Sequence, residues 1–467
     1  MSKDGQMKFP ISKEKAFYNT VRVIAIPIIA QQLIMVGVNI MDTVMLARLG
    51  EGQIAGSSLA NQFISIYQVM CLGIGVGATV LTARYWGAKR IDLLKKSVTI
   101  MIRIALVLAV LFFLASLFIP NAIMTIYTNE EEIIREGAVY LRWSSVTFFL
   151  TGVCLPLTQV LRSFGVTKVS LYGSIGAFFI NIFFNYVLIF GKFGFPRMEI
   201  AGAALGTLIA RVFEFLVVGI YFFHLDKKIR YKIKDIFMKC GDLVGTYVQL
   251  CVPPIMSDFL LALGNNVVSV VMGHIGGSFV AANAVAVVVM RMITVFAGGL
   301  STAACIVTGQ NLGKGEFNKM EEQGNSFFLI GAVIGTIGAV IIKTISGPMI
   351  SYYKLELGTV VIAQQMMDAL CIIIIFQCVN TILTKGVLRG GGDTKFLLLA
   401  DILFLWVLSI PAGYLLGIVL KAPAFWTYIA LKLDQIVKAF WCLGRLWSGK
   451  WIKKVGVEQK IEESTEF

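Results

Sequence analysis

Residues 160–168 read VLRSFGVTK, and residues 387–395, which lie 227 positions later, read VLRGGGDTK. Six of these nine positions are identical. Further residues match at the same spacing, among them Pro27 with Pro254, Gly37 with Gly264 and Asn39 with Asn266. The chain therefore consists of two similar halves. In a membrane protein such a repeat is typical of a transporter whose substrate path lies between the halves.

The composition indicates an integral membrane protein. Of the 467 residues 57% are hydrophobic and 15% are charged, and the mean hydropathy is +0.80, whereas soluble domains carry about 25% charged residues. The apolar residues lie in long runs, and a helix needs roughly 20 such residues to cross a bilayer. We predict twelve spans at residues 22–47, 57–83, 100–123, 139–161, 169–190, 200–223, 246–273, 281–308, 326–348, 360–385, 396–419 and 424–447.

Basic loops set the expected orientation. Residues 84–96 and 227–239 are rich in Lys and Arg, whereas residues 130–136 are acidic. Because Lys and Arg collect in cytoplasmic loops, we expect a multi-pass protein of the plasma membrane with both termini in the cytoplasm. This topology also accounts for the net charge of +14, so the lipid bilayer is an expected partner and nucleic acid is not.

The predicted fold class is all-α integral membrane, with twelve transmembrane helices in two pseudo-symmetric six-helix lobes. The predicted N-lobe is residues 1–223, and a cytoplasmic linker follows at 224–245. The predicted C-lobe is residues 246–450, followed by a cytoplasmic tail at 451–467. The equal halves are expected to be parallel repeats, related by an axis along the membrane normal.

Ionisable residues inside spans are functional candidates, because a charge in the bilayer is costly. Asp42 lies in the first span, and its repeat counterpart is Ser269, so the shared scaffold does not require a carboxylate there. Asn181 and Asn185 are one helical turn apart on one face of the fifth span, and Thr207 lies in the sixth. Their oxygens suit a hard cation such as Na⁺, or a proton site. Packing hydrogen bonds are the alternative for the two asparagines.

Other charges in the spans leave alternatives open. Asp258 and Arg291 are candidates for lining a substrate cavity, or for satisfying one another. Arg211 and Glu214 lie three residues apart in the sixth span and are predicted to form a structural ion pair.

Two further sets of residues bear on function. Arg162 and Arg389, which are repeat equivalents, could anchor to lipid headgroups or cap helix ends. The two histidines are far apart, and the eight cysteines are scattered without a CxxC motif. The residues therefore do not suggest an enzyme, a cofactor or a metal centre, apart from a possible Na⁺ at the polar residues of spans 1, 5 and 6.

Several motifs, in this order, resemble the multidrug and toxic compound extrusion (MATE) family. They are MDTVM at 41–45, INIFFNYVLIFG at 180–191, AGAA at 201–204, GQNLG at 309–313 and GVLRGGGD at 386–393, within a resemblance that covers residues 15–450. The resemblance implies a secondary active antiporter that exports organic cations or drugs in exchange for H⁺ or Na⁺. The coupling ion would be its only cofactor, and we expect it to act as a monomer.

The family's N-lobe cation site falls on Asp42, Asn181, Asn185 and Thr207, although some members carry Asp where this chain has Asn185. The C-lobe departs from the sodium-driven branch of the family. That branch has a glutamate in span 7, and a tyrosine and an aspartate in span 10, where this chain has Ala262, Phe376 and Asn380. Coupling is therefore expected in the N-lobe.

Other functions remain open beside this expectation. The main alternative is a lipid-linked precursor or polysaccharide flippase of related fold, although such flippases often have additional spans and a strongly basic cavity. A sugar-type facilitator would be expected to carry an acidic residue in the loop at 84–90, where this chain has none. An integral-membrane enzyme would need clustered catalytic side chains.

Overall fold

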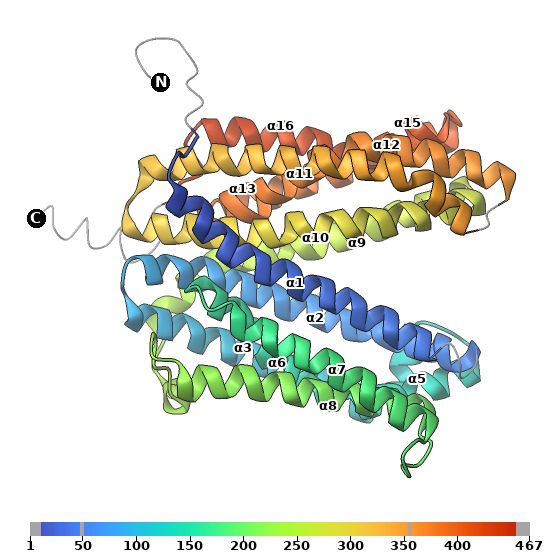
Figure 1. Ribbon diagram of the computed structural model, residues 1–467, viewed down its shortest axis with the longest axis horizontal. Helices are drawn as coiled ribbons and strands as arrows, with labels where there is room; N and C mark the ends of the chain where they lie inside the picture. The colour runs from blue at the N-terminus through green and yellow to red at the C-terminus, as the bar shows by residue number, and fades with distance from the viewer. Residues whose placement is uncertain (1–10, 47–50, 354–355, 454–467) are drawn as a thin grey trace, which may run out of the picture. The chain divides into compact units, whose positions relative to one another are not determined.

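The computed structural model describes residues 11–46, 51–353 and 356–453, which form helices and turns (Figure 1). The first half of the chain contains α1 (Lys15–Leu46), α2 (Glu51–Gly87), α3 (Ile91–Phe118), α4 (Pro120–Thr125), α5 (Glu131–Ser144), α6 (Thr147–Ser163), α7 (Lys168–Phe190), α8 (Glu199–Ile220), η1 (Tyr221–Leu225) and η2 (Ile233–Phe237). The second half contains α9 (Gly241–Ile275), α10 (Gly277–Lys314), α11 (Phe317–Tyr352), α12 (Leu357–Thr381), η3 (Ile382–Leu388), α13 (Thr394–Asp401), η4 (Ile402–Ser409), α14 (Ile410–Tyr414), η5 (Leu415–Val419), α15 (Ala424–Leu431) and α16 (Leu433–Trp447).

The long apolar helices agree with the predicted spans except at two breaks. Among the described residues, ten helical segments are long and apolar enough to cross a bilayer, and α5 with α6 forms an eleventh that bends by 59°. The predicted span at 424–447 is divided at Lys432 into α15 and α16, each too short to cross alone. Hydropathy therefore predicted the apolar length of these two spans but not that each is broken.

The chain divides into two compact units, and the division lies inside helices. The first unit comprises Ile26–Cys251, and the second comprises residues up to Ala25 together with those from Val252 onward. We call these the first lobe and the second lobe. The predicted N-lobe and C-lobe differ from them at both starting helices, because the beginning of α1 belongs to the second lobe and the beginning of α9 to the first. Repeat-matched prolines, Pro27 and Pro254, stand beside the two points of division.

Specific contacts hold the beginning of α1 in the second lobe. The backbone N–H of Ser12 donates to Ser326 Oγ at 2.9 Å, and the Phe17 ring meets that of Phe327 edge-on at 5.2 Å. In the first lobe, the beginning of α9 is held by Tyr247, whose hydroxyl donates to the Ile74 carbonyl at 3.4 Å. Each lobe is thus completed by the first turns of a helix that continues in the other.

The repeated stretch forms the same turn in both halves. Gly165 and Gly392 adopt φ values of +80° and +88°, which only glycine adopts at little cost. The N–H of Val166 donates to the Leu161 carbonyl at 3.0 Å, and the equivalent bond from Asp393 to Leu388 measures 3.1 Å. The turns lead directly into α7 and α13, so this repeat sets where the fifth and eleventh spans begin.

The two other glycines of residues 387–395, Gly390 and Gly391, allow close packing instead. A Cβ at Gly390 would lie 2.6 Å from the Cys305 carbonyl oxygen, and a Cβ at Gly391 would lie 2.4 Å from the buried ring of Trp451. The GGG sequence therefore supplies one left-handed residue and two close approaches.

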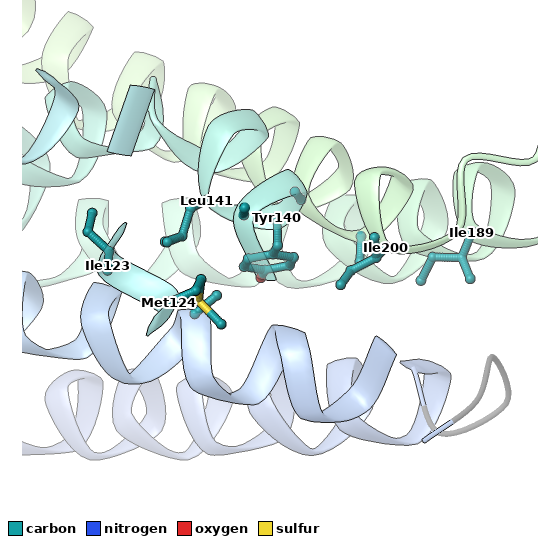
Figure 2. Close-up of a cluster of buried hydrophobic side chains, with 10 residues drawn as sticks. Ile123, Met124, Tyr140, Leu141, Ile189 and Ile200 are labelled. Atoms are coloured by element: carbon teal, nitrogen blue, oxygen red, sulfur yellow. The ribbon is translucent and has the colours of Figure 1, made fainter. Parts of the chain in front are cut away.

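Apolar packing at one end of the first lobe involves α2, α4, α5, α7 and α8 (Figure 2). Its buried members are Ala60, Ile123, Met124, Ala138, Tyr140, Leu141, Ile189, Ile200, Ala203 and Ala204. Met45, three residues after Asp42 in α1, packs against this cluster. The cluster thus fixes the end of α1 that carries the predicted coupling carboxylate.

The linker between the halves is bound along α3. Arg103 Nη2 donates to the carbonyls of Ile236 at 2.6 Å and Met238 at 2.9 Å, and Lys95 forms an ion pair with Asp235 at 3.1 Å. Partial burial raises the pKa of Asp235, but hydrogen bonds from Lys232 and Lys95 outweigh it and the net pKa is lowered. Basic residues of α3 thus help to fix this segment.

We expect Gly165→Ala to destabilise the protein by about 1–2 kcal/mol, since a Cβ disfavours the left-handed conformation. A Cβ at Gly165 would meet nothing within 4 Å, so backbone strain is the cause. Gly245→Ala, at an exposed site in α9 with equally open space, should be neutral or stabilising. Thermal unfolding of the purified variants measures both. Equal melting temperatures for the two variants would contradict this explanation.

Candidate functional site

The first lobe brings the four predicted coupling residues together. Asn185 Nδ2 donates to Asp42 Oδ1 at 2.6 Å and lies 3.4 Å from Asn181 Oδ1, and Asn181 Nδ2 donates to Thr207 Oγ1 at 3.3 Å. The spacing of the two asparagines places both on the face of α7 that meets α1 and α8. The result is a continuous polar chain from a carboxylate to a hydroxyl across three helices.

One atom in this chain is left unsatisfied. Asn185 is 1% exposed, and its Oδ1 has no hydrogen-bond partner among the described residues. An unpaired buried acceptor costs about 1–3 kcal/mol, and this oxygen is free to accept a hydrogen bond. The neighbouring position is Gly206, where a Cβ would lie 2.2 Å from this oxygen. Glycine therefore leaves the space in which the amide sits.

A small cavity adjoins these residues. Its volume is about 80 Å³, and its polar lining includes Ser174, Asn181, Thr207, Arg211 and Glu214. Drug-sized ligands occupy pockets of about 300–1,000 Å³, so this cavity is too small to enclose one. Its size suits an inorganic cation or a few water molecules.

A second polar chain runs from this cavity to the repeated arginine. Arg211 pairs with Glu214 at 2.5 Å, which confirms the predicted ion pair. Ser174 Oγ donates to Glu214 at 2.8 Å, Gln31 donates to Ser174 at 2.8 Å, and Arg162 donates to Gln31. Buried polar groups thus connect α6, α1, α7 and α8 through one set of hydrogen bonds.

Arg211 is the residue whose relation to the site was not expected. Asp42 has no cationic neighbour in its own helix, but the positive charge of Arg211 in α8 acts on its carboxylate. Arg211 and Asp42 lie 169 positions apart in the sequence, so no local pattern could show it.

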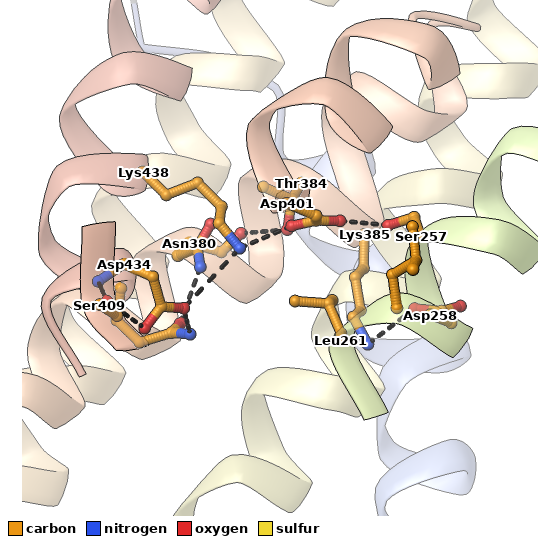
Figure 3. A network of polar contacts seen from close by, with 12 residues as sticks. Ser257, Asp258, Leu261, Asn380, Thr384, Lys385, Asp401, Ser409, Asp434 and Lys438 are labelled. Atoms are coloured by element: carbon orange, nitrogen blue, oxygen red, sulfur yellow. Dashed lines mark hydrogen bonds and ion pairs between the residues drawn. The ribbon is translucent and has the colours of Figure 1, made fainter. Parts of the chain in front are cut away.

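The second lobe places the two predicted substrate-cavity residues apart. Arg389 donates to the Asp258 carboxylate from Nη1 at 3.3 Å and from Nη2 at 3.4 Å. Lys385 forms an ion pair with the same carboxylate at 3.2 Å (Figure 3). Two other cations therefore satisfy Asp258. Arg291 is exposed on α10, and its pairing with Asp258, considered from the sequence, is not observed.

The repeated arginines make equivalent contacts, although the sequence suggested lipid headgroups or helix ends as their partners. Gln31 and Asp258 lie 227 positions apart, as Arg162 and Arg389 do. Each buried arginine therefore binds the side chain at the same position of its lobe's first helix, a neutral amide in one lobe and a carboxylate in the other.

Comparison with known proteins identifies relatives along most of the chain. The MatE family model matches residues 27–187 and 253–415, one stretch in each half. The uncharacterized transporter YisQ of Bacillus subtilis is 23% identical over 419 residues, which cover 88% of this chain and 90% of YisQ. The probable multidrug resistance protein YoeA of the same organism is 26% identical over 353 residues, covering 74% of this chain and 75% of YoeA.

Solved structures show the same fold. An outward-facing multidrug resistance MATE family transporter superposes with a TM-score of 0.82 at 18% identity, covering 93% of this chain and 97% of the other. A transporter from Pyrococcus furiosus superposes with a TM-score of 0.83 at 17% identity, with the same coverage. The fold is therefore all-α integral membrane, with twelve transmembrane helices in two lobes, as predicted.

We expect Gly206→Ala to weaken the interaction between Asn185 and Asp42. Its Cβ would force the Asn185 amide to move, and such overpacking costs about 1–3 kcal/mol of folding free energy. We therefore expect a lower stability and a weaker response of transport to the proposed coupling ion. Gly219→Ala, in the same helix, would meet nothing closer than 3.9 Å and serves as the control. The measurement is the ion-concentration dependence of transport, and an unchanged dependence in both variants would contradict this role of Gly206.

Arg389→Gln should destabilise the second lobe. It leaves Asp258 with Lys385 alone, and removing one partner of a buried pair costs about 3–5 kcal/mol when no other partner remains. The remaining lysine reduces the expected loss to about 1.5–3 kcal/mol. Lys343→Gln, at an exposed pair with Asp368, should cost less than about 1 kcal/mol. Denaturant unfolding of both variants measures the difference.

Proposed function

The chain belongs to the MatE family of multidrug transporters, and we propose that it is a secondary active antiporter that exports organic cations or drugs in exchange for H⁺ or Na⁺. One observation supports this proposal above the others. Asp42, a carboxylate within a membrane helix, is hydrogen-bonded to Asn185 beside Asn181 and Thr207. These are the oxygen and amide groups with which a single small cation could be held.

Exchange follows from the scarcity of negative charge in this site. Two unit charges 4 Å apart interact by about 4 kcal/mol at an effective dielectric constant of about 20, which corresponds to roughly a thousandfold in affinity. A proton or Na⁺ that neutralises Asp42 removes this attraction for an organic cation. The two cations therefore compete for one carboxylate, and an inward ion gradient can displace the exported compound.

The amide of Asn185 suits both charge states of Asp42. Toward the carboxylate it presents its N–H, and after rotation it would present Oδ1, the atom that has no partner among the described residues. A protonated Asp42 could then donate to it, and a bound Na⁺ could be coordinated by it. Neutralising the carboxylate would thus satisfy the buried acceptor and change the contact between α1 and α7.

The names of the relatives support the substrate class. YoeA of Bacillus subtilis and NorM of Photorhabdus laumondii are both described as probable multidrug resistance proteins. For this chain we propose lipophilic organic cations, since Asp42 offers a carboxylate within a membrane helix that is hydrogen-bonded to a neutral amide. We further propose that the protein acts as a monomer in the plasma membrane, with both termini in the cytoplasm and no cofactor other than the coupling ion.

Asp42→Asn tests the coupling role, because it keeps the shape of the side chain and removes its charge. In proteoliposomes with separately imposed H⁺ and Na⁺ gradients, we expect gradient-driven efflux of a lipophilic cation to fall by about tenfold or more. The expected loss reflects a charged hydrogen bond worth about 1.5–3 kcal/mol. Asp368→Asn, at a partly exposed carboxylate paired with Lys343, is the matched control and should transport normally.

Two results would overturn the proposal. One is normal gradient-driven efflux by Asp42→Asn with correct insertion in the membrane. The other is movement of lipid-linked cargo, without any response to organic cations, which would favour the flippase alternative.

A further inference from the structure

The second lobe contains a buried cluster of charges that lies outside the Asp258 pairs. Lys438 on α16 donates to Asp401 Oδ1 at 2.6 Å and lies 3.9 Å from Asp434 Oδ2 (Figure 3). The side chains of the three residues are between 2% and 8% exposed. Ser257 also donates to Asp401. One ammonium group therefore serves two carboxylates in the interior of a membrane protein.

Asp434 interacts more weakly with this ammonium than Asp401 does, since Lys438 Nζ lies 1.3 Å closer to Asp401 Oδ1 than to Asp434 Oδ2. Its other contacts are neutral. Ser409 Oγ lies 3.3 Å from Asp434 Oδ1, and Gln435 Nε2 donates to Asp434 Oδ2 at 2.5 Å. An ionised carboxylate without a full cationic partner is costly at such a position.

The surrounding charges do not supply that partner. Lys432 acts on Asp434 electrostatically, but its ammonium donates to Asn265 at 3.4 Å. The charge of Asp401 acts on Arg389, but Arg389 and Lys385 both form ion pairs with Asp258. The Cys442 thiol lies near Lys438 and Asp401. From the elements packed against Asp434, α12 presents the amide of Asn380 and η4 the hydroxyl of Ser409, and both are neutral.

Two amides are linked to Asp434 by hydrogen bonds. Asn380 Nδ2 donates to Gln435 Oε1 at 2.8 Å, and Gln435 in turn donates to Asp434. This direction leaves Asn380 Oδ1 without a hydrogen-bond partner among the described residues, although Asn380 is only 4% exposed. Figure 3 shows Asn380 and Asp434 on the same side of Lys438.

Reversing both amides would give Asn380 Oδ1 a donor and place Asn380 Nδ2 where that oxygen stood, and it is possible only if Asp434 carries a proton. The Asp434 O–H would then donate to Gln435 Oε1, and Gln435 Nε2 would donate to Asn380 Oδ1, with every heavy atom in its place. Oxygen and nitrogen positions of such amides are assigned from the hydrogen-bond network, so both directions fit one geometry. The chain of amides can therefore follow Asp434 between its charged and neutral forms.

The chemistry favours a proton over a metal cation. Lys438 already occupies the position between the two carboxylates, so a second cation there would be repelled by its charge. A proton needs only one acceptor oxygen and no coordination shell. The second-lobe cluster therefore suits a proton. The first-lobe site is less crowded and does not have this restriction.

We propose that Asp434, with Asp401, Lys438, Gln435 and Asn380, forms a second proton-binding site, which takes up and releases one proton. It lies in the second lobe and is separate from the Asp42 site. The repeat does not demand it, because the counterpart of Asp401 in the first lobe is Ser174, 227 positions earlier.

Infrared difference spectroscopy of the purified, membrane-reconstituted protein tests this site without any transport assay. Over a pH titration, the carbonyl stretching band of protonated carboxyl groups should lose one component in Asp434→Asn. Proton uptake measured in the same range should fall by one proton per molecule. Asp368→Asn, at the exposed pair with Lys343, should leave both readouts as in the wild type. A spectrum and proton count unchanged by Asp434→Asn would overturn the proposal.

A second variant keeps the test decisive if Asp434→Asn fails to fold. Ser409→Ala removes the hydroxyl next to Asp434 and should shift the same carboxyl band, because loss of a hydrogen bond changes the carbonyl stretch. No shift in a folded Ser409→Ala protein would also overturn the proposal. Asp42→Asn should remove a different component or none, so failure of the first-lobe coupling proposal can be told apart from failure of this one.

Discussion

A buried arginine ties the first helix of each lobe to the fourth span of its half. Arg162 donates to Gln31, and Arg389 pairs with Asp258. A guanidinium group inside a membrane protein must be paired or it is strongly destabilising, so these contacts restrict how the helices can pack. In the first lobe the same hydrogen bonds continue through Ser174 to Glu214. This chain positions α7 and α8, which carry Asn185 and Thr207 to Asp42.

The two lobes keep this geometry but distribute charge differently. At the positions of Gln31 and Ser174, the second lobe has Asp258 and Asp401. Two carboxylates there require cations, and Lys385 and Lys438 supply them along with the shared arginine. In the first lobe, Asp42 is hydrogen-bonded to the neutral amide of Asn185, and the charge of Arg211, which is itself paired with Glu214, acts on it from α8. Because Arg211 is already paired with Glu214, Asp42 has no ion-pair partner among the described residues, which is the property that the proposed exchange requires.

Both lobes also leave an amide oxygen unpaired next to an aspartate. In the first lobe it is Asn185 Oδ1 beside Asp42, and in the second it is Asn380 Oδ1, one residue removed from Asp434 through Gln435. An amide can present either its oxygen or its N–H, so it tolerates both protonation states of a neighbouring carboxyl group. The charge of each site can therefore change without a large rearrangement of the helices.

Much of the fold could be predicted because its signals are local. Apolar runs predicted the spans, and the repeated motif marked two equivalent turns with left-handed glycines. The spacing of Asn181 and Asn185 placed both on one helix face, and the charge of Asp42 inside a span marked it as a candidate. The resemblance then assigned these residues and Thr207 to one site. Breaks at Ser145 and Lys432 were not predicted, since hydropathy averages over a span and does not register where one helical turn stops.

The sequence by itself determined the class of fold, the number of spans, the two-fold repeat and the identity of the carboxylate in the first span. These properties depend on composition and on residues close together in the chain. Tertiary structure alone decided which buried charges are paired. It placed Arg211 where its charge acts on Asp42, and it paired Asp258 with Arg389 and Lys385. It also left Asp434 3.9 Å from Lys438. The physical reason is that a buried charge takes its partner from whichever helix packs against it, and neighbouring helices are far apart in the chain.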